Sequence, residues 1–113
     1  MEISEELITE VYEILKEEAK AGRSISYFAL DEMISQDFGP RLQGLFPILN
    51  EICRREVKAG RGMLSAVVVR KGRDDPGEGF YRLAAELYKK DIDDEEGFFI
   101  EEREKVWSYW GKN

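Results

Sequence analysis

The fold is decided by residues 41–73, which read RLQGLFPILNEICRREVKAGRGMLSAVVVRKGR. Apolar side chains recur at helical spacing through the first half of this stretch. Pro47 interrupts them, and proline cannot donate its backbone hydrogen bond inside a helix. We therefore expect a brief turn at 41–44 and a longer helix that has Pro47 in its first turn and runs to about Gly60.

The second half of the stretch predicts the best strand in the chain. Residues 63–69, MLSAVVV, end in β-branched side chains and are followed by a polar loop with strong turn chemistry at 71–79. Such a loop can return the chain into a short second strand at 79–81. The sequence therefore predicts a small β-hairpin.

Upstream of this stretch, Ser26 is a candidate N-cap for a short helix, and Gly39-Pro40 stops that helix. A short helix, a tight turn and a longer helix form the outline of a helix-turn-helix. Together with the hairpin, they predict a core over residues 24–82. We expect this core to be winged-helix-like.

Both ends of the chain add helices. Ser4 is a candidate N-cap and Gly22 a C-cap glycine for the first helix, and apolar spacing predicts another helix from Phe80. The aromatic-rich segment 92–113 predicts a final helix. We expect one domain over residues 1–113, of the α+β class and mostly helical, with extra N- and C-terminal helices around the winged-helix-like core.

Composition narrows the functional classes. The chain has 113 residues, a formal charge of −7 and no His, which removes Ser-His-Asp catalysis, imidazole metal sites and imidazole pH switches. Its one cysteine cannot close an intrachain disulfide, and its longest apolar run is far shorter than a membrane span. These features predict a cytoplasmic protein without a membrane role, a cofactor or recognisable catalytic residues.

The charge is segregated along the chain. Residues 1–40 hold 3 basic and 10 acidic side chains, residues 41–82 hold 9 and 5, and residues 83–113 hold 5 and 9. Clustered lysine and arginine are what phosphate contact requires, so the basic middle is where nucleic acid would bind. The candidate contacts are Arg41, Arg54, Arg55, Lys58, Arg70, Lys71 and Arg73. The alternative is a basic surface that pairs with the acidic helices of the same protein.

The acidic segment 91–102 resembles a calcium loop in the spacing of its acids. Position six of such a loop needs a glycine, but Glu96 stands there and the glycine comes one place later, at Gly97. The favoured interpretation is an acidic linker that caps the final helix. We therefore expect no metal site, and we expect Cys53, on an apolar helix stripe, to be a buried small side chain.

The last helix carries Trp107, Tyr109 and Trp110, and helical geometry places its aromatic side chains on more than one face. Aromatic residues are enriched at the cores of interfaces, so Trp107 and Trp110 are candidates for binding a protein partner or a second copy of the chain. The alternative is that this helix folds back over the first one.

Two resemblances follow from these motifs. The runs LSAVVV at 64–69 and PGEGF at 76–80, followed by VWSYW at 106–110, look like a family of small uncharacterised bacterial proteins, which implies no particular activity. The middle of the chain also resembles the winged-helix domain of the alkylguanine DNA alkyltransferases and alkyltransferase-like proteins. Arg41 and Gly44 match the Arg-x-x-Gly that opens the recognition helix in that family.

The second resemblance has limits. Where that family has Pro-Cys-His-Arg-Val-Val, with its alkyl-accepting cysteine, this chain has LSAVVV at 64–69. The resemblance therefore implies the fold and a DNA-facing helix, without alkyl transfer. The leading hypothesis is a non-enzymatic module that contacts nucleic acid through the basic middle. The rival is a protein-interaction module, such as an adaptor, an immunity protein or an inhibitor of a nucleic-acid enzyme, that uses acidic and aromatic faces.

Overall fold

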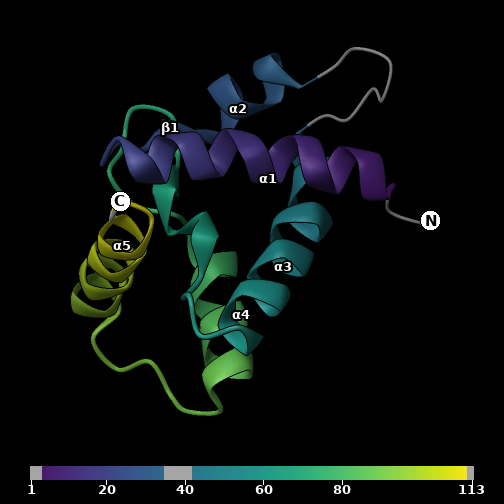
Figure 1. The fold of residues 1–113 in the computed structure, drawn as a ribbon. Coiled ribbons are helices and arrows are strands. Elements are labelled where there is room, and N and C mark those ends of the chain that lie inside the picture. The colour runs from purple at the N-terminus through teal and green to yellow at the C-terminus, as the bar shows by residue number, and fades with distance from the viewer. Residues whose placement is uncertain (1–3, 35–41, 112–113) are drawn as a thin grey trace.

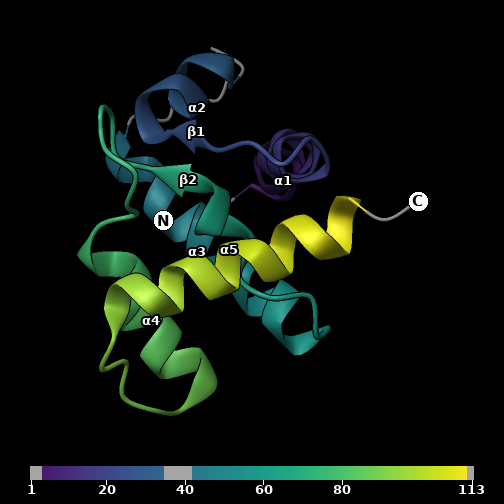
Figure 2. The same ribbon diagram turned by 90° about the vertical axis from the view of Figure 1, so that its left-hand side faces the viewer.

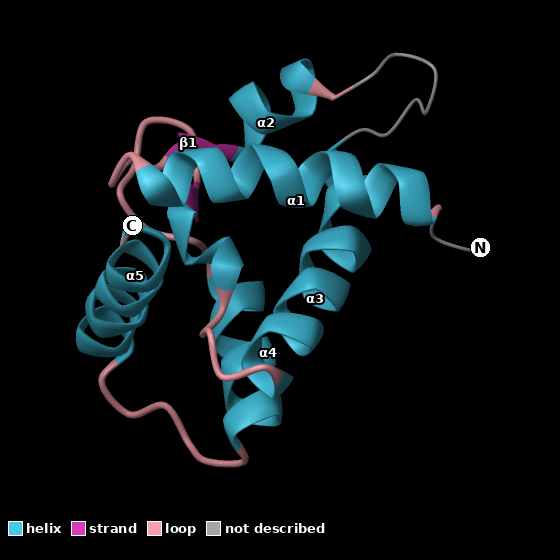
Figure 3. Ribbon diagram, viewed as in Figure 1, coloured by secondary structure: helices cyan, strands magenta, loops and turns pink. Residues whose placement is uncertain are grey.

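The computed structural model describes residues 4–34 and 42–111 (Figure 1). Within these ranges the chain forms five α-helices, one short 3₁₀ helix and two very short strands (Figure 3). In chain order, these are α1 (Glu5–Lys20), β1 (Ile25–Ser26), α2 (Tyr27–Met33), α3 (Leu42–Lys58), η2 (Leu64–Val67), β2 (Val68–Val69), α4 (Glu78–Tyr88) and α5 (Glu95–Gly111). The prediction of a mostly helical α+β protein is confirmed.

The predicted N-caps of α1 and α2 and the predicted glycine after α1 are confirmed in atomic detail, whereas α2 ends at Met33, before the expected stop at Gly39-Pro40, which lies outside the described residues. The Ser4 hydroxyl accepts a hydrogen bond from the Leu7 amide, and the Ser26 hydroxyl accepts one from the Ala29 amide. Each satisfies one of the backbone donors that have no partner in the first turn of a helix. Gly22, just beyond α1, has a φ of 68°, the left-handed conformation of a C-terminal glycine.

The 3₁₀ helix η2 lies at the centre of the molecule. Leu64, Ala66 and Val67 are completely buried, and α1, α3 and α5 all pack against them. Figure 1 shows these three helices around the η2 segment, and Figure 2 shows α5 crossing in front, between β2 and α4. The described apolar side chains form one core cluster, with η2 inside it.

The predicted strand at 63–69 is largely wrong, because only Val68–Val69 forms a strand and Leu64–Val67 is a 3₁₀ helix. All seven residues of this run are buried, so it lacks the alternation of a half-exposed strand. A long strand needs a partner along its whole length, whereas here Ile25 pairs with Val68 and Ser26 with Val69, in parallel. The preceding turn satisfies its own backbone instead, for example where the Ala66 amide donates to the Met63 carbonyl at 2.9 Å.

The predicted β-hairpin is also wrong, since residues 79–81 lie in the first turn of α4. Gly77 has a φ of 86°, which lets the loop turn directly into the helix at Glu78. The helix from there buries Phe80 and Leu83 on one face. Residues 79–81 are therefore helical because the helix buries this face. The strand β2 pairs with β1 and not with the residues after the loop.

The turn expected between the two middle helices is not at 42–44, because α3 already begins at Leu42. Pro47 lies inside this helix as its sixth residue. The prediction that Pro47 lies in the first turn is therefore wrong. Only the first four backbone amides of a helix lack a partner within it, so at this position proline removes one intrahelical hydrogen bond, the one to the Gln43 carbonyl. Arg41, the first residue of the expected turn, lies outside the described residues.

Candidate functional site

The arginines of α3 that the sequence predicts as nucleic-acid contacts are ion-paired within the protein. The guanidinium of Arg55 donates to both oxygens of Glu5, at 3.2 and 2.7 Å, and to Glu51 at 2.9 Å. These hydrogen bonds raise the pKa of Arg55. Arg54 points to a different neighbour and reaches Glu86 of α4 at 3.4 Å.

The cations of the loop between β2 and α4 are held in the same way. Arg70 and Arg73 both pair with Asp75, at 2.6 and 3.1 Å. The loop is closed further by the Arg70 amide, which donates to the Asp75 carbonyl at 2.8 Å, and by the Tyr27 hydroxyl, which donates to the Pro76 carbonyl at 2.7 Å. This segment is a self-paired loop, so the predicted hairpin wing is absent from it.

Two of the predicted contacts have no carboxylate partner among the residues that the structure describes. Lys58 is exposed in the last turn of α3. Lys71 is exposed too, and its ammonium lies 4.4 Å from the centre of the Phe28 ring. The predicted contacts of the basic middle therefore do not act as one group. Most of them are paired separately with acidic side chains of the same chain.

Unpaired charge gathers instead on the linker before α5 and on the first ten residues of this helix. Seven exposed carboxylates there have no ion pair within the described ranges, and we call them the acidic end: Asp91, Asp93, Asp94, Glu95, Glu96, Glu101 and Glu104. Two surface pockets open beside them. One, of about 400 Å³, lies between the self-paired loop and the first turns of α4 and α5, and includes Glu78 and Tyr81. The other, of about 220 Å³, lies along residues 90–101.

The local geometry explains why the glycine of this segment is Gly97, one place later than a calcium loop requires. The carboxylate of Asp94 accepts a hydrogen bond from the Gly97 amide at 3.0 Å, which makes Asp94 the N-cap of α5. A Cβ atom at position 97 would clash with that carboxylate, so a larger residue there would have to push the cap aside. Among the described residues, no group of three or more acidic or cysteine side chains is arranged to hold a metal ion.

The C-terminal aromatic residues pack on the N-terminal part of the chain. The Trp107 indole donates to the Arg23 carbonyl at 3.0 Å, and Trp110 meets the Tyr12 ring edge-on, with 6.2 Å between ring centres. Between Phe99 and Trp107, the guanidinium of Arg103 lies 4.6 and 4.8 Å from the two rings. Both tryptophans are half-buried, so the contact with the α1 region occupies part of the surface expected for a partner.

Arg103 joins α5 to two other segments. It donates to both oxygens of Asp74 in the self-paired loop, at 2.7 and 3.3 Å, and to the Ser24 hydroxyl at 3.2 Å. Its hydrogen bonds lower the pKa of Asp74. This one side chain therefore fixes the middle of α5, next to Glu101 and Glu104 of the acidic end, against the rest of the fold.

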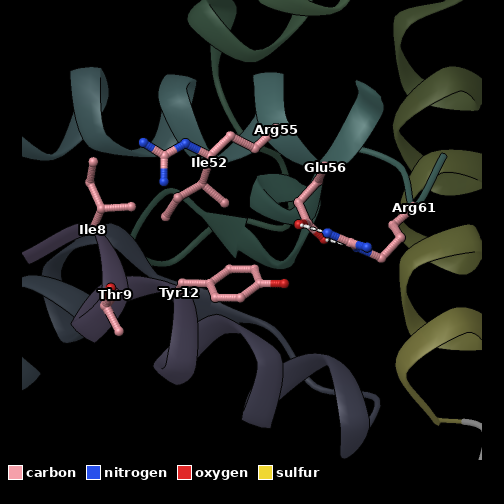
Figure 4. Close-up of a pocket in the computed structure, with 7 residues that line it drawn as sticks. All are labelled: Ile8, Thr9, Tyr12, Ile52, Arg55, Glu56 and Arg61. Atoms are coloured by element: carbon pink, nitrogen blue, oxygen red, sulfur yellow. Dashed lines mark hydrogen bonds and ion pairs between the residues drawn. The ribbon is translucent and has the colours of Figure 1, made fainter. Parts of the chain in front are cut away.

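A further pocket, of about 200 Å³, opens between α1 and α3 (Figure 4). Its lining consists of Ile8, Thr9, Tyr12, Ile52, Arg55, Glu56 and Arg61. Glu56 is only 2% exposed, and both of its oxygens accept from Arg61, at 2.8 and 2.7 Å. In Figure 4 the Tyr12 hydroxyl points toward this pair, and the Arg55 guanidinium lies at the opposite end.

Sequence reasoning missed this pocket, although a signal was present. Glu56 follows Ile52 by four residues and therefore lies on the buried stripe of α3, where a charged side chain is unexpected. The same signal marks Glu102, a carboxylate in α5 that is 3% exposed between the buried residues Phe99 and Val106. It accepts from the Met63 amide at 2.9 Å and from the Tyr88 hydroxyl.

Cys53 is a buried thiol, as its position on the apolar stripe predicts. Its sulfur donates to the Ser65 hydroxyl at 3.1 Å, and burial raises its pKa to about 11. A thiol in this state is a poor nucleophile at neutral pH, because only the thiolate reacts.

None of the helices in the described ranges combines the length and apolar character that crossing a membrane requires. Comparisons with family models, curated proteins and solved structures find no match for this chain.

Proposed function

We propose that this protein is a non-enzymatic, cytoplasmic protein-interaction module that presents its acidic end to a basic surface of a partner protein. One observation carries the proposal. Five arginines of the basic middle are paired with carboxylates of the same chain, namely Arg54, Arg55, Arg61, Arg70 and Arg73, whereas the carboxylates of residues 91–104 have no cation partner within the described ranges except Glu102. The exposed cations Lys58, Lys71 and Arg82 are without such a pair but lie apart in the sequence, so the largest group of unpaired charges among the described residues is the acidic end.

Electrostatics favour this direction of binding. A chain with a formal charge of −7 repels a polyanion at long range and attracts a basic surface. To contact a phosphate, Arg55 or Arg70 first has to leave a carboxylate partner within the same chain. The acidic end needs no such rearrangement. Two pockets beside it offer room for lysine or arginine side chains, and an adaptor, an immunity protein or an inhibitor of a nucleic-acid enzyme uses such a surface.

The experiment compares two triple variants of equal charge. In the first, Glu95, Glu96 and Glu101 of the acidic end become glutamine, and in the control the same change is made at Glu6, Glu13 and Glu17 of α1, which are exposed as well. Each protein is used to capture partners from lysate at rising salt, and captured proteins are identified by mass spectrometry. We expect a basic partner that the first variant loses and the control keeps.

Retention of the same partner by the first variant would contradict the proposal, as would equal loss by both variants. A partner whose capture is insensitive to salt would also contradict it, because contact between exposed charges is screened at high ionic strength.

The nucleic-acid hypothesis and its winged-helix geometry stay as a second prediction. The observation in their favour is that Lys58 and Lys71 are exposed and without a carboxylate partner in the described ranges. Two phosphate contacts predict a slope of about −2 in log affinity against log salt. Titration of a labelled duplex at low salt tests this. If binding is unchanged when both lysines are replaced by glutamine, these two lysines do not contact the nucleic acid.

A further inference from the structure

The pocket between α1 and α3 is a built site rather than a shallow gap. Its inner end is formed by the buried carboxylate of Glu56 and its partly exposed partner Arg61, and its walls by Ile8, Ile52 and the Tyr12 ring (Figure 4). Removing a carboxylate from water is costly even when a guanidinium is paired with it. A buried carboxylate that lines an open pocket therefore points to binding.

The polar groups around this pocket mostly offer hydrogen-bond donors. A guanidinium has five N–H groups, and Arg55 uses three of them on Glu5 and Glu51. The Tyr12 hydroxyl is directed at Glu56 and Arg61, so the remaining donors of the lining are the other two N–H groups of Arg55 and the exposed Thr9 hydroxyl. The oxygens of Glu56 are already engaged by Arg61. A ligand that matches this lining supplies an acceptor, together with an apolar body for the two isoleucines and the tyrosine ring.

Glu5 is not part of the lining, but it holds the guanidinium of Arg55, which is the partner that a ligand carboxylate would need. It lies in the first turn of α1, next to the lining residues Ile8 and Thr9, and both of its oxygens contact Arg55. The Glu5 side chain is 71% exposed, so an exchange of this partner returns a carboxylate to water at little cost. Glu56, in contrast, is buried and is not available for exchange.

We propose that this pocket binds a small organic carboxylate with an aromatic or branched apolar body, whose carboxylate replaces Glu5 on Arg55. The volume of about 200 Å³ limits the ligand to a molecule below drug size. This inference is independent of the acidic end, which lies on other elements of the fold.

Benzoate is the probe, and benzamide is its neutral counterpart of the same shape. Binding is followed by the NMR shifts of amides in α1 and α3. We expect benzoate to bind with a dissociation constant on the order of 1 mM and benzamide to bind at least about tenfold more weakly. Glu5→Gln removes the competing carboxylate, so it strengthens benzoate binding severalfold.

Arg55→Gln and Arg54→Gln form the matched pair of variants. Both positions are exposed on α3, but Arg54 points to Glu86 of α4 and is not part of the lining. We expect Arg55→Gln to abolish binding and Arg54→Gln to leave it unchanged. Thr9→Trp, at an exposed lining position, fills the pocket and provides a second block that does not touch the arginines.

Three results would overturn the proposal: equal binding of benzoate and benzamide, equal loss in the two arginine variants, or no saturable shifts around the pocket. A peptide with a free C-terminal phenylalanine is the last arm, because a chain terminus offers the same carboxylate chemistry. If this peptide binds and benzoate does not, the ligand is a protein terminus, and the assignment to a free small molecule is wrong.

Discussion

Replacing Glu102 by alanine tests whether the buried carboxylate holds α5 onto the core. Glu102 is 3% exposed and connects three parts of the chain: it accepts from the Met63 amide and the Tyr88 hydroxyl, and its other oxygen lies 3.4 Å from the Lys105 ammonium. Burial and the contact with Glu102 raise the pKa of Tyr88, so this hydroxyl remains a donor at all ordinary pH values.

The magnitude follows from what alanine leaves behind. The Met63 amide loses its side-chain acceptor in a buried position, which costs about 1–3 kcal/mol, and the half-buried Tyr88 hydroxyl loses a bond of about 1 kcal/mol. Relief of the cost of burying a carboxylate offsets a part of this. We expect a net loss of about 2 kcal/mol. For a chain of 113 residues this corresponds to a fall in melting temperature of about 8 °C.

The assay is urea unfolding followed by circular dichroism, with two controls. Glu102→Gln keeps an oxygen for the Met63 amide, so we expect a loss of only about 1 kcal/mol. Lys105→Ala removes the exposed partner of the carboxylate and is expected to cost less than about 0.5 kcal/mol. If Glu102→Ala costs no more than Lys105→Ala, the bonds to Met63 and Tyr88 contribute nothing measurable, and the reasoning is refuted.

Three further predictions concern the loop and the core. Arg103→Lys keeps the charge but loses the two-point contact with Asp74 and the stacking on two rings, so thermal unfolding should show a loss of about 1–2 kcal/mol, and an unchanged melting temperature would speak against the contact. Burial raises the pKa of Asp75, but the ion pairs with Arg70 and Arg73 outweigh burial and leave this pKa below its ordinary value of 3.8. The hydrogen bonds of Arg103 lower the pKa of Asp74 as well. Both carboxylates therefore stabilise the fold at pH values above 3.8. This contribution is lost as the pH falls below about 4, and unfolding curves between pH 7 and 3 should show a weaker acid dependence in Asp74→Asn. The thiol of Cys53 should react with a thiol reagent at pH 8 only as fast as the protein unfolds, and rapid labelling of the native protein would contradict its burial.

Helix boundaries could be predicted where a local side chain fixes them. Ser4 and Ser26 cap α1 and α2 through bonds that span three residues, and such bonds are written directly in the sequence. The helix from Phe80 is also predictable, because apolar side chains at helical spacing need only one neighbouring surface to pack against.

The run MLSAVVV could not be predicted in the same way. A short apolar run is compatible with a buried strand or a buried helical turn, and the choice depends on whether a partner strand is available. Here the partner is β1, which has two residues and comes from 43 positions earlier in the chain, so only Val68 and Val69 are paired. The hairpin prediction failed for the same reason, since the residues after the loop gain more from burying Phe80 in α4.

The charge pattern was counted correctly, but its meaning depends on distant contacts. Arg55 pairs with Glu5 across 50 positions, and Arg54 pairs with Glu86 across 32. No local spacing reveals such pairs. The unpaired acidic end, in contrast, is a continuous stretch of the sequence and needs no tertiary contact to be recognised.

The central position of η2 also constrains how the protein can be made. Residues 64–67 are covered by α1 and α3, which precede them, and by α5, which is synthesised last among the described elements. On the ribosome, the apolar run therefore stays without part of its cover until the final helix emerges, after roughly 2–9 s of further synthesis at about 5–20 residues per second. During that interval the nascent chain exposes its most apolar segment, so a chain that stalls before α5 is the form that chaperones and proteases would meet.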